Sequence, residues 1–424
     1  MAAIFVKQGS FAKATVPGVQ AVRPADLSWT PTAVIFFYTQ QSVVGFATGI
    51  RKGAGLVAAN AQRAVSYAAD QAATTNVWQR MAAAGITLTN GAGTLQWQAT
   101  VTLVAGGFDV NWTTNVGGAE IIHYWALGGG GLTNVFVGDT LLGTATGNLA
   151  VTAPAFQGDV LVMLGVNSSG VLPINVATDP GVSLGVAVST AQRWSIALGS
   201  RDGRSNQNNF GKTQRIDRCY RVLAREALVQ SVDFVSHDAL GFTVTKVAAD
   251  VAVPKDKRMA YLYIKGGKWS AGSFPQPAVL GQQTVTGVGL RPLGLLFAGW
   301  NNAANTAILT GRTDFYLGGA SFGPQGNNGR GAVHLANPTI NNAIMASTTS
   351  EAVVHAAASV TQAKAEVPGA WAGSFYLDWP IVDVTAREVL YLAVGVRVIL
   401  RVSRSPMRPS QVPRSRCLRE QPPT

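Results

Sequence analysis

Three similar stretches of sequence recur along the chain: EIIHYWALGG at 120–129, RMAYLYIKGG at 258–267 and EVLYLAVG at 388–395. Each is an apolar run rich in aromatic and β-branched residues that ends in glycine, which is typical of a strand followed by a turn. The last glycines of the first two stretches are 138 residues apart, and the last glycine of the third follows 128 residues later. Solenoid and propeller repeats have periods of roughly 20–50 residues. The longer period predicts three tandem copies of a whole domain.

Two further segments recur in each copy. An apolar run follows a turn near the start: WTPTAVIFFY at 29–38, FQGDVLVMLG at 156–165 and LRPLGLLFAG at 290–299. A short aromatic segment precedes the closing strand: GFDVNW at 107–112, GFTVT at 241–245 and SFYLDW at 374–379. We therefore predict repeats at 1–130, 131–267 and 268–396, joined by glycine turns and followed by an Arg- and Pro-rich tail at 397–424.

The secondary structure is predicted to be all-β. Short runs of β-branched and aromatic residues alternate with turn signals such as Asn90-Gly91 and Asp202-Gly203. This pattern favours three β-sandwich domains of jelly-roll-like type over a parallel sheet. The alanine-rich segment 58–73 has the composition of a helix, but its counterparts at 187–198 and 326–336 do not, so we expect a strand in all three repeats.

Composition limits the class of protein. Charged residues make up 13% of the 424 residues, against roughly 25% in ordinary soluble domains, so much of the surface must be uncharged and polar. Such a surface suits assembly or sugar contact. The net charge is +12, and half of it lies in 397–424, which holds seven Arg and one Glu. We expect this tail to be disordered, with nucleic-acid contact as the alternative. We expect no signal peptide, membrane span or disulfide framework.

Two constellations invite an enzymatic interpretation. Asp233, His237 and Asp238 can offer two carboxylates and an imidazole to a metal. The Gly-x-Ser-x-Gly spacing occurs at Ser183 and at Ser321, but a nucleophile elbow needs a helix after the serine, and neither sequence continues as one. We therefore predict a non-enzymatic protein with no catalytic residue, no cofactor and no metal.

An arginine recurs in the middle of each repeat. Gln62-Arg63 and Gln192-Arg193 align, with Arg330 in the third repeat. A guanidinium in this place can bind a carboxylate or sugar, or can anchor a loop through an ion pair. We favour the ion pair and keep the ligand as the alternative.

Two tryptophans recur in the aromatic segments, each after a polar residue: Trp112 after Asn111, and Trp379 after Asp378. Packing in the core is the default for such residues. Exposed, each pair would form a platform for a sugar ring.

The shared pattern of the three repeats resembles domains of bacteriophage and prophage virion proteins. It consists of the apolar run, a Gly/Arg loop, the Phe-containing segment and the closing strand that ends in glycine. The resemblance covers 1–396 and implies a structural protein of a phage-like particle, located in the tail, baseplate, fibre or capsid surface and also suited to host attachment. Its implied partners are copies of itself, other virion proteins and host surface glycans. It also implies that the protein is made in the host cytoplasm and ends in the virion. The alternative function is a multivalent carbohydrate-binding protein on a virion or bacterial surface.

Overall fold

The computed structural model describes residues 2–69, 76–203, 210–249, 256–300, 307–310, 313–322, 329–337, 344–357, 360–383 and 387–397. Over these ranges the chain forms thirty-three strands and no helix, and the strands pair into six antiparallel sheets. The predicted all-β fold is confirmed. No helix of the described residues is long and apolar enough to cross a membrane. The predicted tail, apart from Arg397, lies outside the described residues.

The first repeat comprises β1 to β11. Its strands are β1 (Phe5–Ala12), β2 (Gly18–Val22), β3 (Pro31–Thr39), β4 (Gly45–Thr48), β5 (Ile50–Ala58), β6 (Gln62–Ala69), β7 (Val77–Ala82), β8 (Ile86–Thr89), β9 (Leu95–Val104), β10 (Gly107–Asn115) and β11 (Ile121–Gly128). The large sheet runs in the order β1-β11-β3-β5-β6-β7, and the small sheet in the order β2-β10-β9-β8. The alanine-rich segment is a strand over Gln62–Ala69, as the repeat pattern predicts.

The second repeat uses the same order with β12 to β22. Its strands are β12 (Leu132–Leu141), β13 (Gly147–Val151), β14 (Val160–Val166), β15 (Ile174–Val176), β16 (Gly181–Ala187), β17 (Arg193–Gly199), β18 (Gly211–Arg215), β19 (Tyr220–Ala224), β20 (Ala227–Asp238), β21 (Gly241–Ala249) and β22 (Arg258–Gly266). The large sheet is β12-β22-β14-β16-β17-β18, and the small sheet is β13-β21-β20-β19.

The third repeat follows with β23 to β33. Its strands are β23 (Lys268–Pro275), β24 (Gly281–Val285), β25 (Leu290–Trp300), β26 (Leu309–Thr310), β27 (Thr313–Ser321), β28 (Gly329–Asn337), β29 (Ile344–Thr348), β30 (Val353–Ala357), β31 (Val360–Trp371), β32 (Ser374–Ile381) and β33 (Glu388–Arg397). The large sheet is β23-β33-β25-β27-β28-β29, and the small sheet is β24-β32-β31-β30.

Within each repeat the small sheet packs on one face of the large sheet as a β-sandwich. In the first repeat, Phe108 and Trp112 of β10 point inward and contact the same buried cluster as Tyr124 of β11. The residues between them, Asp109 and Asn111, point outward. This alternation is the period-two pattern of a strand with one buried face. The other repeats have corresponding clusters of their own.

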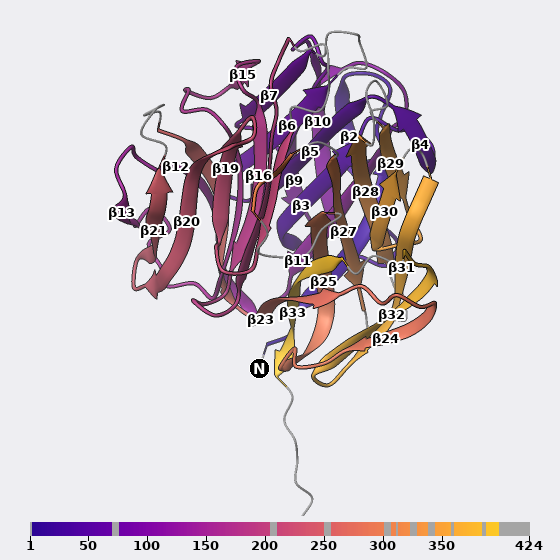
Figure 1. Ribbon diagram of the computed structural model, residues 1–424. Helices are drawn as coiled ribbons and strands as arrows, with labels where there is room; N and C mark the ends of the chain where they lie inside the picture. The colour runs from indigo at the N-terminus through magenta and orange to yellow at the C-terminus, as the bar shows by residue number, and fades with distance from the viewer. Residues whose placement is uncertain are drawn as a thin grey trace, which may run out of the picture.

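The other face of each large sheet is also buried, because the three large sheets face one another around a common axis. One apolar cluster draws side chains from all three repeats, including Trp125, Leu262 and Leu392 at equivalent positions of β11, β22 and β33. Figure 1 shows the three thirds of the chain, purple, red and orange-yellow, arranged around this centre. The chain thus builds a threefold pseudo-symmetric ring from a single polypeptide.

Short arms exchanged between repeats close the ring. Each arm lies in the loop after the first long inner strand and adds one strand to the free edge of a neighbouring large sheet. β15 of the second repeat pairs with β7 of the first, β26 of the third with β18 of the second, and β4 of the first with β29 of the third. The exchange is cyclic, so the same edge is covered in every large sheet. An uncovered edge is a template for pairing with another chain.

One hydrogen bond recurs at an equivalent position in all three interfaces between repeats. The first strand of each repeat packs on the large sheet of a neighbour: β12 on β5 and β6, β23 on β17, and β1 on β27 and β28. At one equivalent position a backbone N–H donates to a polar side chain across the interface. The three bonds are Val137 N to Asn60 Oδ1 at 3.0 Å, Ala271 N to Gln192 Oε1 at 3.4 Å and Gln8 N to Ser321 Oγ at 3.0 Å. The position is kept while the acceptor differs.

Candidate functional site

All three predicted arginines are engaged in ion pairs. The pairs are Arg63 with Asp139, whose Nε and Oδ1 lie 2.5 Å apart, Arg193 with Asp233, and Arg330 with Glu366. The second and third pairs lie within one repeat, whereas the first joins β6 to β12 of the next repeat. These contacts agree with the loop-anchoring interpretation, in which the guanidinium forms an ion pair with a carboxylate of the protein.

The first arginine is not equivalent to the other two. Three glycines fix the alignment of the repeats, because a Cβ on any of them would collide with the backbone oxygen of the residue just before β8, β19 or β30, the edge strands of the small sheets: Gly55, Gly185 and Gly318. Each glycine pairs with a residue of the next strand, and the residue two positions before that partner is Gln62, Arg193 or Arg330. Gln62 is therefore the equivalent of the two arginines. The Gln62 amide hydrogen-bonds the backbone of β9 there. The sequence alignment was therefore one residue out, and Arg63 points to the opposite face of the sheet, toward the next repeat.

Trp112 and Trp379 pack in the core, which was the default expectation, so the alternative of exposed sugar platforms at these two positions is wrong. Trp112 and Trp379 are at most 1% exposed, because the alternation along β10 and β32 turns them into the sandwich. Each indole N–H donates to a glutamine of the neighbouring strand: Trp112 to Gln20 at 3.0 Å and Trp379 to Gln283 at 3.1 Å. Asn111 and Asp378, next to them in sequence, point outward and are exposed.

The possible metal ligands of the second repeat are engaged separately. Asp233 pairs with Arg193. The two ring nitrogens of His237 contact the Tyr263 hydroxyl at 3.0 Å and a backbone carbonyl at 3.1 Å, and burial lowers the pKa of His237. Asp238 accepts hydrogen bonds from Ser236 and Thr243. Among the residues that the structure describes, no group of three or more His, Cys, Asp or Glu side chains is placed to hold a metal ion.

The two serines of the Gly-x-Ser-x-Gly matches lie in strands rather than at sharp turns. Ser183 is buried in β16, and Ser321 is buried at the end of β27. The Ser321 hydroxyl accepts the backbone N–H of Gln8. A nucleophile elbow presents its serine at an exposed turn between a strand and a helix, and neither serine has that setting.

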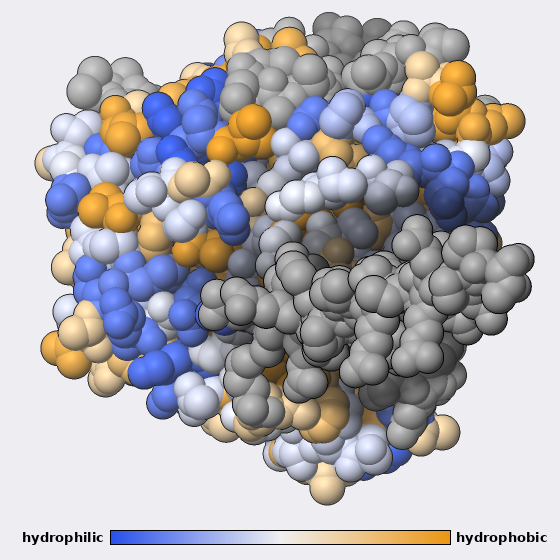
Figure 2. Space-filling model, turned by 90° about the horizontal axis from the view of Figure 1, so that it is seen from below, coloured by the Kyte–Doolittle hydropathy of each residue, from blue (hydrophilic) through white to orange (hydrophobic). Residues whose placement is uncertain are grey.

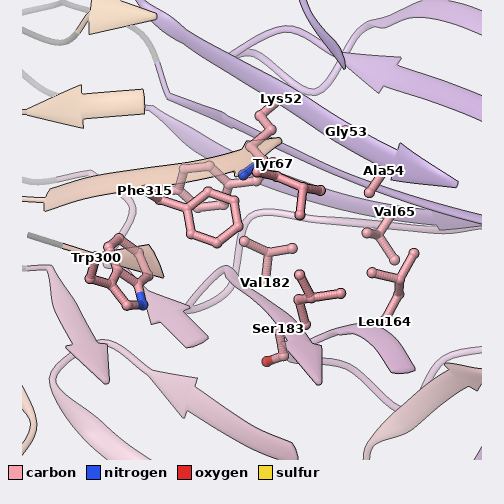
Figure 3. A pocket seen from close by; sticks show the side chains of 12 residues that line it. Lys52, Gly53, Ala54, Val65, Tyr67, Leu164, Val182, Ser183, Trp300 and Phe315 are labelled. Atoms are coloured by element: carbon pink, nitrogen blue, oxygen red, sulfur yellow. The ribbon is translucent and has the colours of Figure 1, made fainter. Parts of the chain in front are cut away.

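A small cavity lies on the pseudo-threefold axis, where all three repeats contribute to its wall. Its volume is about 20 Å³, enough for about one water molecule. Lys52, Val182 and Phe315 occupy equivalent positions in β5, β16 and β27, since each pairs with the corresponding residue of the preceding strand. Figure 3 shows the Lys52 side chain extending toward the Phe315 ring, with Val182 on another wall.

Lys52 is the chemically unusual member of this cavity. It is 4% exposed, and its Nζ lies 2.7 Å from the centroid of the Phe315 ring. No hydrogen-bond acceptor lies within reach of Nζ among the described residues. Burial without a counter-charge holds the pKa of Lys52 well below its usual range. An amine with a lowered pKa can act as a nucleophile, but the volume around Lys52 is too small for an organic substrate.

Trp371 is an exposed residue that the sequence analysis did not single out. It ends β31 and stacks on Tyr376 of β32. A signal for it was present in the sequence. Ala372 and Gly373 form a tight turn before Ser374-Phe375, and an inward Phe375 places Ser374 and its partner Trp371 outward.

Comparison with known proteins adds no relative to these observations. No protein-family model matches the sequence, and no curated protein matches it.

Proposed function

We propose that the protein is a non-enzymatic structural component of a phage-like particle, located in its tail, baseplate, fibre or capsid surface. The observation that carries the proposal is the closed ring of three β-sandwiches with cyclic strand exchange. Threefold oligomers close through one heterologous interface used three times. Here the three repeats that form these interfaces belong to one polypeptide, so the unit assembles independently of protein concentration.

The surface supports this proposal. Figure 2 shows that, where described residues are visible from below, hydrophobic residues form small separate groups among hydrophilic and pale ones. A large contiguous apolar face would favour an obligate dimer or a membrane surface instead. The exchanged arms also cover one edge of each large sheet, which limits growth by strand pairing at that edge. A compact unit with a polar surface and few large apolar groups is suited to fixed contacts inside a larger assembly.

A second candidate function is carbohydrate binding, on a virion or on a bacterial surface. The observation that favours it is the exposed Trp371 ring beside polar side chains on the outer face of the third repeat. The two functions are compatible, since an attachment protein of a virion can bind host glycans.

Cryo-electron microscopy of the protein purified from its source, together with mass spectrometry of the particle fraction, tests the proposal. We expect ordered copies of the chain in a symmetric particle or filament. A chain that is absent from every particle fraction and stays a free monomer in solution contradicts a virion role.

A further inference from the structure

The outer face of the small sheet in the third repeat carries an exposed aromatic pair. Trp371 is 57% exposed, whereas each of the other nine tryptophans is buried or partly buried. Its ring stacks on Tyr376 with centroids 4.5 Å apart and planes 18° apart. Tyr376 in turn lies over Gly369, where a Cβ would come within 2.8 Å of its ring. The stack fixes the orientation of the indole and leaves its outer face open.

Polar side chains lie beside this pair on the same face. Tyr376 and Asp378 alternate with buried residues along β32, so both point outward. The pairing with β24 places Thr284 opposite Tyr376 and Gln282 opposite Asp378. Thr284, Gln282 and Asp378 are all exposed. On the outer face of the sheet, the stacked pair is therefore followed, on its Tyr376 side, by hydroxyl, amide and carboxylate groups.

The fold itself does not require an aromatic pair at this place. The same hairpin occurs in every repeat, with Trp371 opposite Ser374, Asp238 opposite Gly241 and Val104 opposite Gly107. The position of the Trp–Tyr pair is thus held by Asp238 and Thr243 in the second repeat and by Val104 and Asp109 in the first. In the second repeat the Thr243 hydroxyl donates to Asp238 at 2.6 Å. The third repeat thus presents an open aromatic face at the position where the second repeat has two polar side chains hydrogen-bonded to each other.

We propose that Trp371 and Tyr376 form the stacking platform of a carbohydrate-binding site, with a pyranose ring on the open face of Trp371. The C–H face of a pyranose is apolar and weakly positive, which complements the negative face of an aromatic ring. Asp378, Thr284 and Gln282 lie on the Tyr376 side of the stack, where they can receive hydroxyls of further units of an oligosaccharide through hydrogen bonds. The site gives the attachment role in the proposed function a ligand class, and it rests on that function.

A protein partner fits this patch less well. A stable protein–protein contact buries about 800 Å² on each side, whereas one aromatic side chain supplies roughly 150–250 Å². The surroundings of the pair are polar and exposed. A single sugar ring matches the size of the platform, and weak binding at one site gains strength when many copies are arrayed on a particle.

The test uses the full chain on an array of neutral and N-acetylated hexose oligosaccharides, followed by calorimetric titration of the best binder. We expect Trp371→Ala to weaken binding at least about ten-fold, in the range for a central aromatic contact. Trp371→Phe should restore part of it, and Asp378→Ala should weaken binding by a smaller factor. Asn111→Ala is the matched control, because Asn111 holds the position of Asp378 in the first repeat, and it should leave the affinity unchanged.

A gain of binding gives the converse test. Val104→Trp and Asp109→Tyr, combined with Thr102→Gly at the place of Gly369, put the same pair on the first repeat, and the titration should then show a second site. The proposal is overturned if the intact chain binds no glycan on the array, or if Trp371→Ala binds as well as the intact chain. Incorporation of the Trp371→Ala chain into particles is measured separately. If the intact chain is incorporated into particles but binds no glycan, the sugar site is contradicted and the structural role is supported. If it binds a glycan but is not incorporated, the structural role is contradicted and the sugar site is supported.

Discussion

The inner sides of the three large sheets differ from the outer sides of the three small sheets. The inner sides share one apolar cluster that crosses all repeat boundaries. The outer sides are polar and exposed along strands such as β10 and β32, and each small sheet packs only within its own repeat. A repeat removed from the ring would expose its inner face to water. The three repeats therefore form one folding unit through their inner faces, while their outer faces vary independently.

Equivalent positions have diverged in opposite ways on the two sides. On the axis, Lys52, Val182 and Phe315 differ in chemistry but fill one common space. On the outer hairpins, Trp371 and Asp238 occupy equivalent positions in different repeats, and these positions are not in contact. Inner changes must compensate one another in a packed core, whereas an outer change has no partner in the neighbouring repeats. The ring is therefore a scaffold on which one repeat can acquire a binding face.

We expect the greatest loss of stability from truncating a large side chain in the core that the three repeats share. Trp194 is fully buried in the shared core and donates its indole N–H to the Tyr391 carbonyl of the third repeat at 2.8 Å. Trp194→Ala should lower the free energy of unfolding by about 3–5 kcal/mol. It should also split the single denaturant transition of the intact chain, because it weakens the coupling between repeats.

Trp112→Ala is the control for this variant, since Trp112 is buried inside one sandwich. It should lower stability by a similar amount in a transition that stays single. Guanidinium titrations followed by near- and far-ultraviolet circular dichroism make the comparison. Three separate transitions in the intact chain would contradict the shared folding unit.

The next effect tests one exchanged arm. Ile174 of β15 is 3% exposed, pairs with Met81 of β7 and belongs to the axial core. Ile174→Ala should lower the free energy of unfolding by about 2–4 kcal/mol, within the range for a buried Ile, and should speed amide exchange along β7. Val171→Ala in the same loop is the control, because Val171 is 85% exposed. Unchanged exchange on β7 in the Ile174 variant would show that the arm does not hold that edge.

Much of the architecture could be predicted from the sequence. The closing strands and their glycines gave the all-β class, and comparison between repeats identified Gln62–Ala69 as a strand against its helical composition. These inferences rest on period-two patterning, which is local. The ring could not be predicted in the same way. Its arms are two to four residues long, too short to carry a pattern, and their partners lie in other repeats.

The candidate sites were harder to predict, because an error of one residue in the alignment of a strand places a side chain on the wrong face of the sheet. The aligned Gln-Arg pairs placed Arg63 with Arg193, but the glycine contacts place Gln62 there. Trp112 and Trp379 were correctly seen to recur, yet alternation turns them inward and leaves Asp378 outside. Trp371 has no counterpart in the other repeats, so the comparison that revealed the fold passed over it.

A smaller effect, of opposite sign, is expected at the axial lysine. Lys52→Met removes a buried amine that has no hydrogen-bond acceptor among the described residues, and it should raise the free energy of unfolding at neutral pH by about 1–3 kcal/mol. The pKa of Lys52 is depressed by burial in the folded state, so the unfolded chain binds more protons below its own lysine pKa. Stability should therefore increase as the pH rises toward about 10.4.

The pH slope separates this cause from simple repacking. The Lys52→Met protein should show a flatter dependence of the unfolding free energy on pH than the intact chain between neutral pH and about 10. Lys268→Met, at an exposed position of β23, should leave the slope unchanged. Equal slopes for the intact chain and the Lys52 variant would mean that the amine is charged, and thus solvated, in the folded state.

The smallest effect compares an ion pair between repeats with one inside a repeat. Arg63 bonds Asp139 across the first interface, and Asp139 also pairs with Arg258. Because Arg258 remains to pair with Asp139, Arg63→Ala should lower stability by only about 1 kcal/mol. Arg330→Ala removes a pair whose acid, Glu366, is 40% exposed, and it should have an effect of at most about 0.5 kcal/mol. Unfolding midpoints at about 0.05 M and about 0.5 M salt make the comparison, since screening reduces the exposed pair more than the partly buried one. A larger loss for Arg330→Ala than for Arg63→Ala would contradict the greater importance of the contacts between repeats.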